Sequence, residues 1–126
     1  MIRAYTQADY PMLVKWLHQH EEPIPDADFF SDIGIVSNEK AIGFLFTTNS
    51  KSCYIDHVVA DRECEPEEKD RALNELVSAL QDIARHRGCR MITVLARIQA
   101  MHKRFTSHGF TPFGVFTLYY KIFPKG

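Results

Sequence analysis

Three short β-prone segments, joined by turns of four polar residues each, limit the possible folds of this chain more than any other feature. The segments cover residues 33–36, 41–48 and 53–60, and they are rich in Ile, Val, Phe and Tyr, which favour strands. Because such short turns connect neighbouring antiparallel strands, the pattern predicts an antiparallel meander.

Amphipathic helical patterns stand on both sides of the meander. After a β-prone stretch at residues 2–5, apolar residues recur every three or four positions over residues 7–18. The longest pattern lies between Pro66 and Arg87, and Gly88 follows it as a stop signal. Each pattern predicts a helix with one buried face.

The last third of the chain continues the alternation of strand and helix. Residues 89–96 predict a strand buried on both faces, and residues 99–108 predict a shorter helix closed by Gly109. The aromatic stretch 110–123 predicts one long or two short strands. The order of elements predicts an α+β fold in a single domain over residues 1–126. We expect a mixed central sheet of about six to seven strands, with two long helices and one shorter helix packed on it.

Composition narrows the class of protein further. With 126 residues, of which 45% are hydrophobic and 25% charged, the chain suits one folded domain and excludes disordered and collagen-like classes. It has no apolar run of about 18 residues and no apolar signal-peptide core near its start, so we expect a soluble cytoplasmic protein without a membrane partner. A net charge of −1 and the lack of a dense basic run argue against a nucleic-acid partner. The three cysteines form no C-x-x-C pair, so we expect reduced thiols and no metal site.

Three local patterns, in this order of elements, resemble the GNAT superfamily of N-acetyltransferases. Residues 2–3 and 6–9 resemble the family's first strand and helix start, and residues 84–88 resemble the end of its cofactor-side helix. Residues 105–110 resemble the late Y-x-x-x-G-F signature. The resemblance covers nearly the whole chain and extends to short phage-encoded members. It implies a GNAT-like fold and the transfer of an acetyl group from acetyl-CoA to a primary amine.

The resemblance also implies where acetyl-CoA binds. In the family it lies in a gap between the fourth and fifth strands, with its pyrophosphate on backbone N–H groups in a Q/R-x-x-G-x-G/A loop at the start of the long helix. Counting back from Gly88 places this motif on residues 68–73, where Arg71 and Leu73 occupy the two small positions and a carboxylate occupies the first. The loop is therefore degenerate by comparison with the family.

The charges at the start of the long helix also differ from what phosphate binding in the family requires. Four carboxylates crowd its first turns, where they stabilise a helix but repel a phosphate; they are Glu65, Glu67, Glu68 and Asp70. Lys69 and Arg71 are the side chains expected to contact the phosphates in place of the glycines. The backbone of Val58, Val59 and Ala60 is expected to face the pantetheine arm.

The family's catalytic base usually lies on the fourth strand, where this chain has Asp56 and His57. Alternation along a strand places these two side chains on opposite faces, so only one of them is expected to face the substrate. The alternative interpretation is structural, with Asp56 hydrogen-bonded and His57 at the sheet surface. The usual acid is the Tyr of the late signature, replaced here by Phe105, and Tyr119 or Tyr120 is the candidate substitute.

Two hypotheses about function follow. In the first, the chain is an acetyl-CoA-dependent N-acetyltransferase, and acidic residues at 26, 28 and 32 favour a cationic small-molecule or peptide amine acceptor. In the second, it is a catalytically inactive GNAT-scaffold protein that has lost ordinary CoA binding and binds a host or virion protein. The aromatic residues of stretch 110–123 then form an interface, or alternatively the paired edge of a homodimer.

Overall fold

In the part of the chain that the structure describes, five strands form one mixed sheet in the order β1-β2-β3-β4-β5. The computed structural model describes residues 1–96 and 99–125. The strands are β1 (Ile2–Ala4), β2 (Ile33–Ser37), β3 (Ala41–Thr47), β4 (Ser52–Ala60) and β5 (Met91–Val94). The helices are α1 (Tyr10–Gln19), α2 (Pro66–His86) and α3 (Gln99–Ser107).

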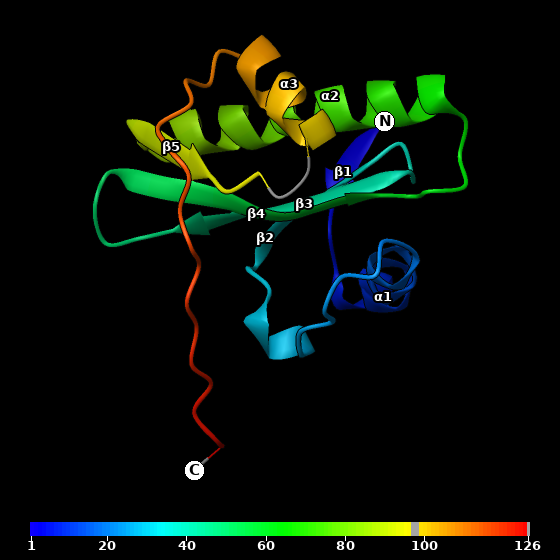
Figure 1. Ribbon diagram of the computed structural model, residues 1–126, viewed down its shortest axis with the longest axis horizontal. Coiled ribbons are helices and arrows are strands. Elements are labelled where there is room, and N and C mark those ends of the chain that lie inside the picture. Colours follow the sequence, from blue (N-terminus) through cyan, green and yellow to red (C-terminus); the bar gives the residue numbers. More distant parts are fainter. Residues whose placement is uncertain (97–98, 126) are drawn as a thin grey trace.

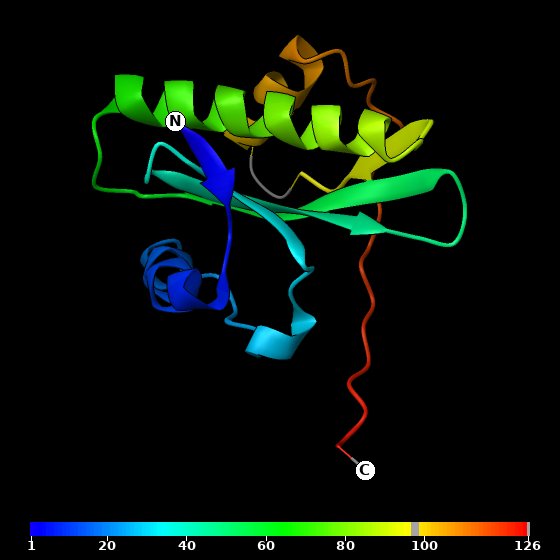
Figure 2. The same cartoon turned by 180° about the vertical axis from the view of Figure 1, so that it is seen from behind.

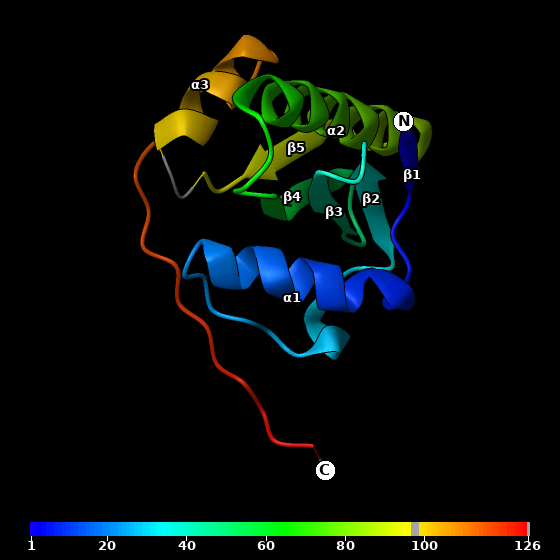
Figure 3. The ribbon, with the colours of Figure 1, turned by 90° about the vertical axis from the view of Figure 1, so that its right-hand side faces the viewer.

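The helices cover the two faces of the sheet in separate layers. Figure 1 and Figure 3 show α2 and α3 on one face and α1 on the other, and Figure 2 shows the same layers from behind. Leu76, Val77 and Leu80 of α2 pack into one core, and Trp16 and Leu17 of α1 pack into the other. Within residues 1–96 and 99–125, no helix is long and apolar enough to cross a membrane.

The pairing of the strands confirms the expected meander. Neighbouring strands from β1 to β4 pair antiparallel, and β5 pairs parallel with β4 after the crossover through α2. The expected stop of the long helix is also confirmed, since Gly88 has a φ of +81° and the N–H of Cys89 donates to the carbonyl oxygen of Ala84 at 3.0 Å. This bond closes the helix with a left-handed turn that favours glycine.

The helix expected over residues 7–18 is confirmed: a 3-10 turn at Gln7–Asp9 leads directly into α1. One expectation about the elements is wrong. The strand or strands expected over residues 110–123 are absent from the described part of the chain, where residues 110–125 have neither helical nor strand structure. β-propensity requires a neighbouring strand to pair with. Residues 111–125, which we call the C-terminal arm, leave the sheet on the side of β5 (Figure 3).

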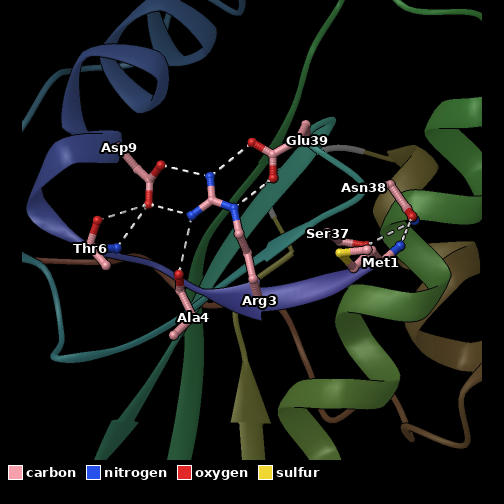
Figure 4. A network of polar contacts seen from close by, with 8 residues as sticks. All are labelled: Met1, Arg3, Ala4, Thr6, Asp9, Ser37, Asn38 and Glu39. Atoms are coloured by element: carbon pink, nitrogen blue, oxygen red, sulfur yellow. Dashed lines mark hydrogen bonds and ion pairs between the residues drawn. The ribbon is translucent and has the colours of Figure 1, made fainter.

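An ion-pair network ties the start of the chain to two other parts of the fold (Figure 4). The guanidinium of Arg3 donates to both carboxylate oxygens of Asp9 at 2.9 and 2.8 Å and to both of Glu39 at 2.7 and 2.9 Å. The N–H of Thr6 also donates to Asp9 at 2.9 Å. Arg3 thereby holds the pKa of Asp9 well below its usual range. The network joins β1 to the helix start and to the turn between β2 and β3.

Candidate active site

A cavity of about 270 Å³ opens where β4 and β5 part. The last described pair between these strands is Ile55 with Val94, whereas β4 continues to Ala60. The cavity volume is near the lower end for small-molecule sites. Most of its walls are apolar, and the polar residues at its surface are His20, Glu22, Asp56, His57, Lys69 and Arg104.

A β-bulge shapes β4 beside this cavity. The register between β3 and β4 shifts by one residue, so that His57 and Val58 lie opposite Gly43. His57 takes a φ of +55°, which is uncommon for a residue with a side chain. Gly43 permits the close approach, because a Cβ there would lie 3.1 Å from Leu76 and 3.2 Å from Val58. Beyond the bulge, Val58 packs on the α2 side of the sheet and Val59 on the α1 side.

The bulge brings Asp56 and His57 to the same cavity. The N–H of His57 donates to Asp56 Oδ1 at 2.7 Å, and His57 Nε2 lies 3.9 Å from Asp56 Oδ2. The expectation that their side chains take opposite faces is therefore wrong, because the bulge interrupts the alternation along β4. The alternative placement of His57 at the sheet surface is wrong as well. Its side chain is 15% exposed, and its ring lies 4.8 Å from the ring of Phe30 and 6.0 Å from that of Phe46.

The expected cofactor-binding residues divide into two groups. Val58, Val59, Ala60 and Lys69 all line the cavity, and Lys69 is half-buried there. Arg71 is exposed and is not among the described residues that line the cavity. The helical period accounts for the difference, since residues two apart on a helix do not share a face.

The carbonyl oxygen of Ala60 already has a partner in His20, the residue directly after α1. His20 Nε2 donates to it at 2.8 Å, and His20 itself lines the cavity. The N–H of Arg62 donates to Gln19 Oε1 at 2.9 Å. These bonds hold the end of α1 against the end of β4, so the cavity has a polar rim that the sequence pattern did not indicate.

Arg104 of α3 is a second cation at the cavity that sequence reasoning missed. Its Nη1 donates to Asp70 Oδ1 at 2.9 Å and to Asn74 Oδ1 at 2.8 Å, and its side chain is 14% exposed. Its Nε is buried and has no hydrogen-bond partner in the described part of the chain. No local signal marks Arg104, because its partners on α2 lie about thirty residues earlier in the chain.

His108 completes the contact between α3 and α2. Its Nε2 lies 3.2 Å from Asn74 Oδ1, and its Nδ1 lies 3.5 Å from Gln81 Nε2. Burial lowers the pKa of His108, and the charge of Arg104 lowers it further. His108 and Arg104 thus share Asn74 Oδ1 as a partner on α2.

The carboxylates of the cavity are Glu22 and Asp56. The acidic residues expected to attract a cationic acceptor lie elsewhere: neither Asp26 nor Asp28 lines either cavity, and Asp32 lines a smaller one of about 140 Å³. The loop after α1 places Glu22 at the cavity and leaves the three aspartates exposed.

The structure brings no tyrosine of the expected pair to the site. Phe105 is buried at the cavity wall, with its ring 5.3 Å from that of Phe110, and it has no proton to donate. Tyr119 and Tyr120 lie in the C-terminal arm, 86% and 83% exposed, and neither is among the residues lining the cavity.

The carboxylates at the start of α2 serve the helix itself. The N–H of Glu65 donates to Glu68 Oε1 at 3.4 Å in a capping box, and Glu67 lies in the same first turn. Residues 68–73, on which the count back from Gly88 placed the phosphate-binding motif, all lie within α2, and Leu73 is buried at the cavity. Among residues 1–96 and 99–125, no cluster of three or more His, Cys, Asp or Glu is placed to hold a metal ion.

Comparison with solved structures identifies the fold. The chain resembles glucosamine-6-phosphate N-acetyltransferase from Arabidopsis thaliana with a TM-score of 0.70 at 14% identity, covering 95% of this chain and 97% of that one. It resembles ribosomal-protein-alanine N-acetyltransferase from Brucella melitensis with a TM-score of 0.70 at 16% identity, covering 90% and 86%. The fold is that of the GNAT N-acetyltransferases.

A third structure with the GNAT fold was solved in complex with CoA. This Mycobacterium tuberculosis protein has a TM-score of 0.75 at 17% identity, covering 90% of this chain and 73% of that one. No family model matches the sequence, and no curated protein matches it. The expected GNAT-like α+β fold is thus confirmed, with five strands among the described residues in place of six to seven.

Proposed function

We propose that this protein is an N-acetyltransferase that moves an acetyl group from acetyl-CoA to a primary amine. The observation that carries the proposal is the cavity between β4 and β5, in which Asp56 and His57 lie side by side against apolar walls. The GNAT fold supports it, because the similar proteins from Arabidopsis and Brucella are named as N-acetyltransferases.

Asp56 and His57 suit the proton transfers that this reaction requires. The amine arrives as an ammonium ion, and a base must remove its proton before the nitrogen attacks. We assign this role to the pair, whose members lie 3.9 Å apart between His57 Nε2 and Asp56 Oδ2. The nitrogen loses a second proton as the C–S bond breaks and the amide forms, so one of the two protons can pass through the pair to the departing thiolate and the other is released to solvent. A protein with Phe105 in place of tyrosine thus retains an acid.

The cavity fits the thioester end of acetyl-CoA. When bound, acetyl-CoA supplies an activated acetyl group at its thioester. Beyond Ile55, β4 has no described pairing with β5, so backbone groups of Val58 and Val59 on that side are positioned to pair with the amides of the pantetheine arm.

Lys69 is the residue we assign to the phosphates. It is half-buried at the cavity, whereas Arg71 is exposed away from it. Arg104 offers a buried Nε at the same cavity, although the carboxylate of Asp70 balances part of its charge. Side chains then bind the anion in place of the glycine loop, against the repulsion of the carboxylates that begin α2.

The acceptor is expected to be cationic. Glu22 and Asp56 are the carboxylates that line the cavity, and both attract an ammonium group. A small polyamine-like molecule or an amine-bearing peptide suits this charge. The proposal therefore concerns amine acceptors and not alcohols or thiols.

A second candidate function is supported by two other observations. Phe105 cannot donate a proton, and the C-terminal arm exposes large apolar side chains. Both suit a GNAT-scaffold protein without catalysis that binds a host or virion protein. Binding of acetyl-CoA separates the two candidates.

The decisive experiment is a calorimetric titration of the full chain with acetyl-CoA, CoA and 3′,5′-ADP, followed by a thiol-release assay over a panel of amines. We expect saturable binding of acetyl-CoA and turnover with at least one cationic amine. Asp56→Asn should lower kcat by about 10²- to 10⁴-fold and leave acetyl-CoA affinity within about threefold. Asp82→Asn is the matched control, since Asp82 is 63% exposed on α2. If the folded protein shows no heat of binding and no thermal shift at millimolar acetyl-CoA, the result favours the candidate function as a binding protein.

A further inference from the structure

Three phenyl rings pack against the imidazole of His57. The ring of Phe30 is the nearest of the three, with its centroid 4.8 Å from that of the imidazole, and the rings of Phe46 and Phe44 lie 6.0 and 6.3 Å away. All three meet the imidazole at interplanar angles of 61–82°, the edge-to-face geometry that favours attraction between aromatic rings. This packing restricts how the imidazole can turn.

The nearest ring comes from a loop and not from the sheet. Phe44 and Phe46 belong to β3, whereas Phe30 directly follows the 3-10 turn Ala27–Phe29 in the loop between α1 and β2. Figure 1 shows this loop on the α1 face of the sheet. The contact between Phe30 and the imidazole therefore depends on how the loop is held.

Hydrogen bonds anchor the loop on both sides of Phe30. Before it, the hydroxyl of Tyr10 donates to the carbonyl oxygen of Pro25 at 3.0 Å, and the Tyr10 ring lies 6.2 Å from that of Phe30. After it, Ser31 Oγ donates to the carbonyl oxygen of Leu45 at 2.6 Å. These contacts join the loop to α1 and to β3, and they place the phenyl ring beside the imidazole.

The orientation of the imidazole depends on its packing. His57 lies at the bulge of β4 with a φ of +55°, where the regular alternation of side chains is interrupted. Its Nε2 lies 3.9 Å from Asp56 Oδ2, which is longer than a hydrogen bond. Proton transfer requires the imidazole nitrogen to lie within hydrogen-bond reach of its partners in the reacting complex. A rotation of the ring would move Nε2 out of reach, and the phenyl rings oppose that rotation.

We propose that Phe30 is a positioning residue, which holds the His57 imidazole beside Asp56 in the orientation that proton transfer requires. This inference rests on the proposed function, because that function assigns the proton transfers to the pair. Within the part of the chain that the structure describes, Phe30 does not line the cavity between β4 and β5 but lines the smaller cavity of about 140 Å³. Loss of its ring therefore gives the imidazole room to turn toward that second space.

The first test measures the orientation of the imidazole by NMR and needs no catalysis. We expect NOEs between the ring protons of His57 and those of Phe46, a contact that a change at Phe30 does not touch directly. Phe30→Leu should weaken these NOEs because the imidazole turns, and Phe30→Tyr, which retains a ring, should keep them. Phe29→Leu is the matched control and should also keep them, since Phe29 lies in the preceding turn and is 45% exposed.

The second test separates a positioning role from a general effect on the fold. Phe30→Leu should lower kcat by about 10- to 100-fold, because a misplacement of about 1 Å at a reacting group can have an effect of this size. It should leave the KM for acetyl-CoA within about threefold. In the His57→Gln background the same change should lower kcat by less than about twofold, since residues that act as a unit are not additive. Thermal unfolding of each variant checks that the fold is retained.

Several results would overturn the proposal. Unchanged NOEs in Phe30→Leu do so, whether or not the protein transfers acetyl groups. An unchanged kcat in Phe30→Leu does so too, and so does an equal loss of kcat in the original and the His57→Gln backgrounds, because Phe30 then acts by another route. Failure of the proposed function is a different result: the unchanged chain acetylates no amine, while Phe30→Leu still weakens the NOEs. That result refutes the acetyltransferase and supports the holding of His57 by Phe30.

Discussion

Replacing Lys69 by alanine should weaken acetyl-CoA binding far more than the same change at Arg71. Lys69 lines the cavity and is half-buried, whereas Arg71, two residues along the same helix, is exposed outside it. The pair is a matched comparison, because both side chains are cations near the start of α2 and only one faces the cavity.

The expected size of the effect follows from the position of Lys69. Two unit charges about 4 Å apart near a protein surface interact by about 4 kcal/mol before desolvation is counted. A hydrogen bond to a charged group contributes about 1.5–3 kcal/mol net. Lys69→Ala should therefore raise the Kd for acetyl-CoA by about 10- to 150-fold. Arg71→Ala should raise it by less than about threefold, because solvent and salt screen an exposed charge at a distance.

Calorimetry on the folded full chain measures both constants, and thermal unfolding without ligand checks that stability is retained. Acetyl-pantetheine, which has no phosphates, is the ligand control, and Lys69→Ala should leave its affinity unchanged. Lys69→Arg should recover most of the affinity for acetyl-CoA. Equal losses for Lys69→Ala and Arg71→Ala, or a loss for acetyl-pantetheine as large as for acetyl-CoA, would refute the assignment of Lys69 to the phosphates.

Three further predictions concern stability. His57 has a φ of +55°, a conformation that asparagine tolerates better than valine. His57→Val should therefore lower the free energy of unfolding, measured in urea, by about 1–2 kcal/mol more than His57→Asn. Equal losses in the two variants would show that the bulge relaxes. Burial lowers the pKa of His108, so the unfolded chain binds the proton first and stability should fall as the pH drops below about 6.5. His108→Gln should remove that part of the dependence of Tm on pH, and an unchanged profile counts against it. Asp9→Ala removes a bidentate partner of Arg3. It should lower the free energy of unfolding by about 1–3 kcal/mol and leave the affinity for acetyl-CoA unchanged. An unfolding midpoint equal to that of the unchanged chain would show that the network is dispensable.

The candidate site was predictable only in part. Asp56 and His57 stand out because polar residues in an apolar strand require partners. That both side chains lie at the same cavity was not predictable, since the bulge in β4 depends on Gly43 of β3 and on the packing of α2 above it. Arg104 was not predictable either, because its position is set by Asp70 and Asn74 on another helix. The exclusion of Arg71 follows from helical geometry alone and was within reach of the sequence.

The sequence by itself determined the elements whose signals are local. The polar turns of the meander, the apolar stripe of α2 and the glycine that ends it act over a few residues, and the structure has each of them where the pattern predicts it. Tertiary structure decided what depends on distant partners. Residues 110–123 have strand propensity but no strand, because a strand forms only against a neighbour that supplies its hydrogen bonds. The cavity likewise exists because two parallel strands part beyond Ile55, which no single segment of the chain encodes.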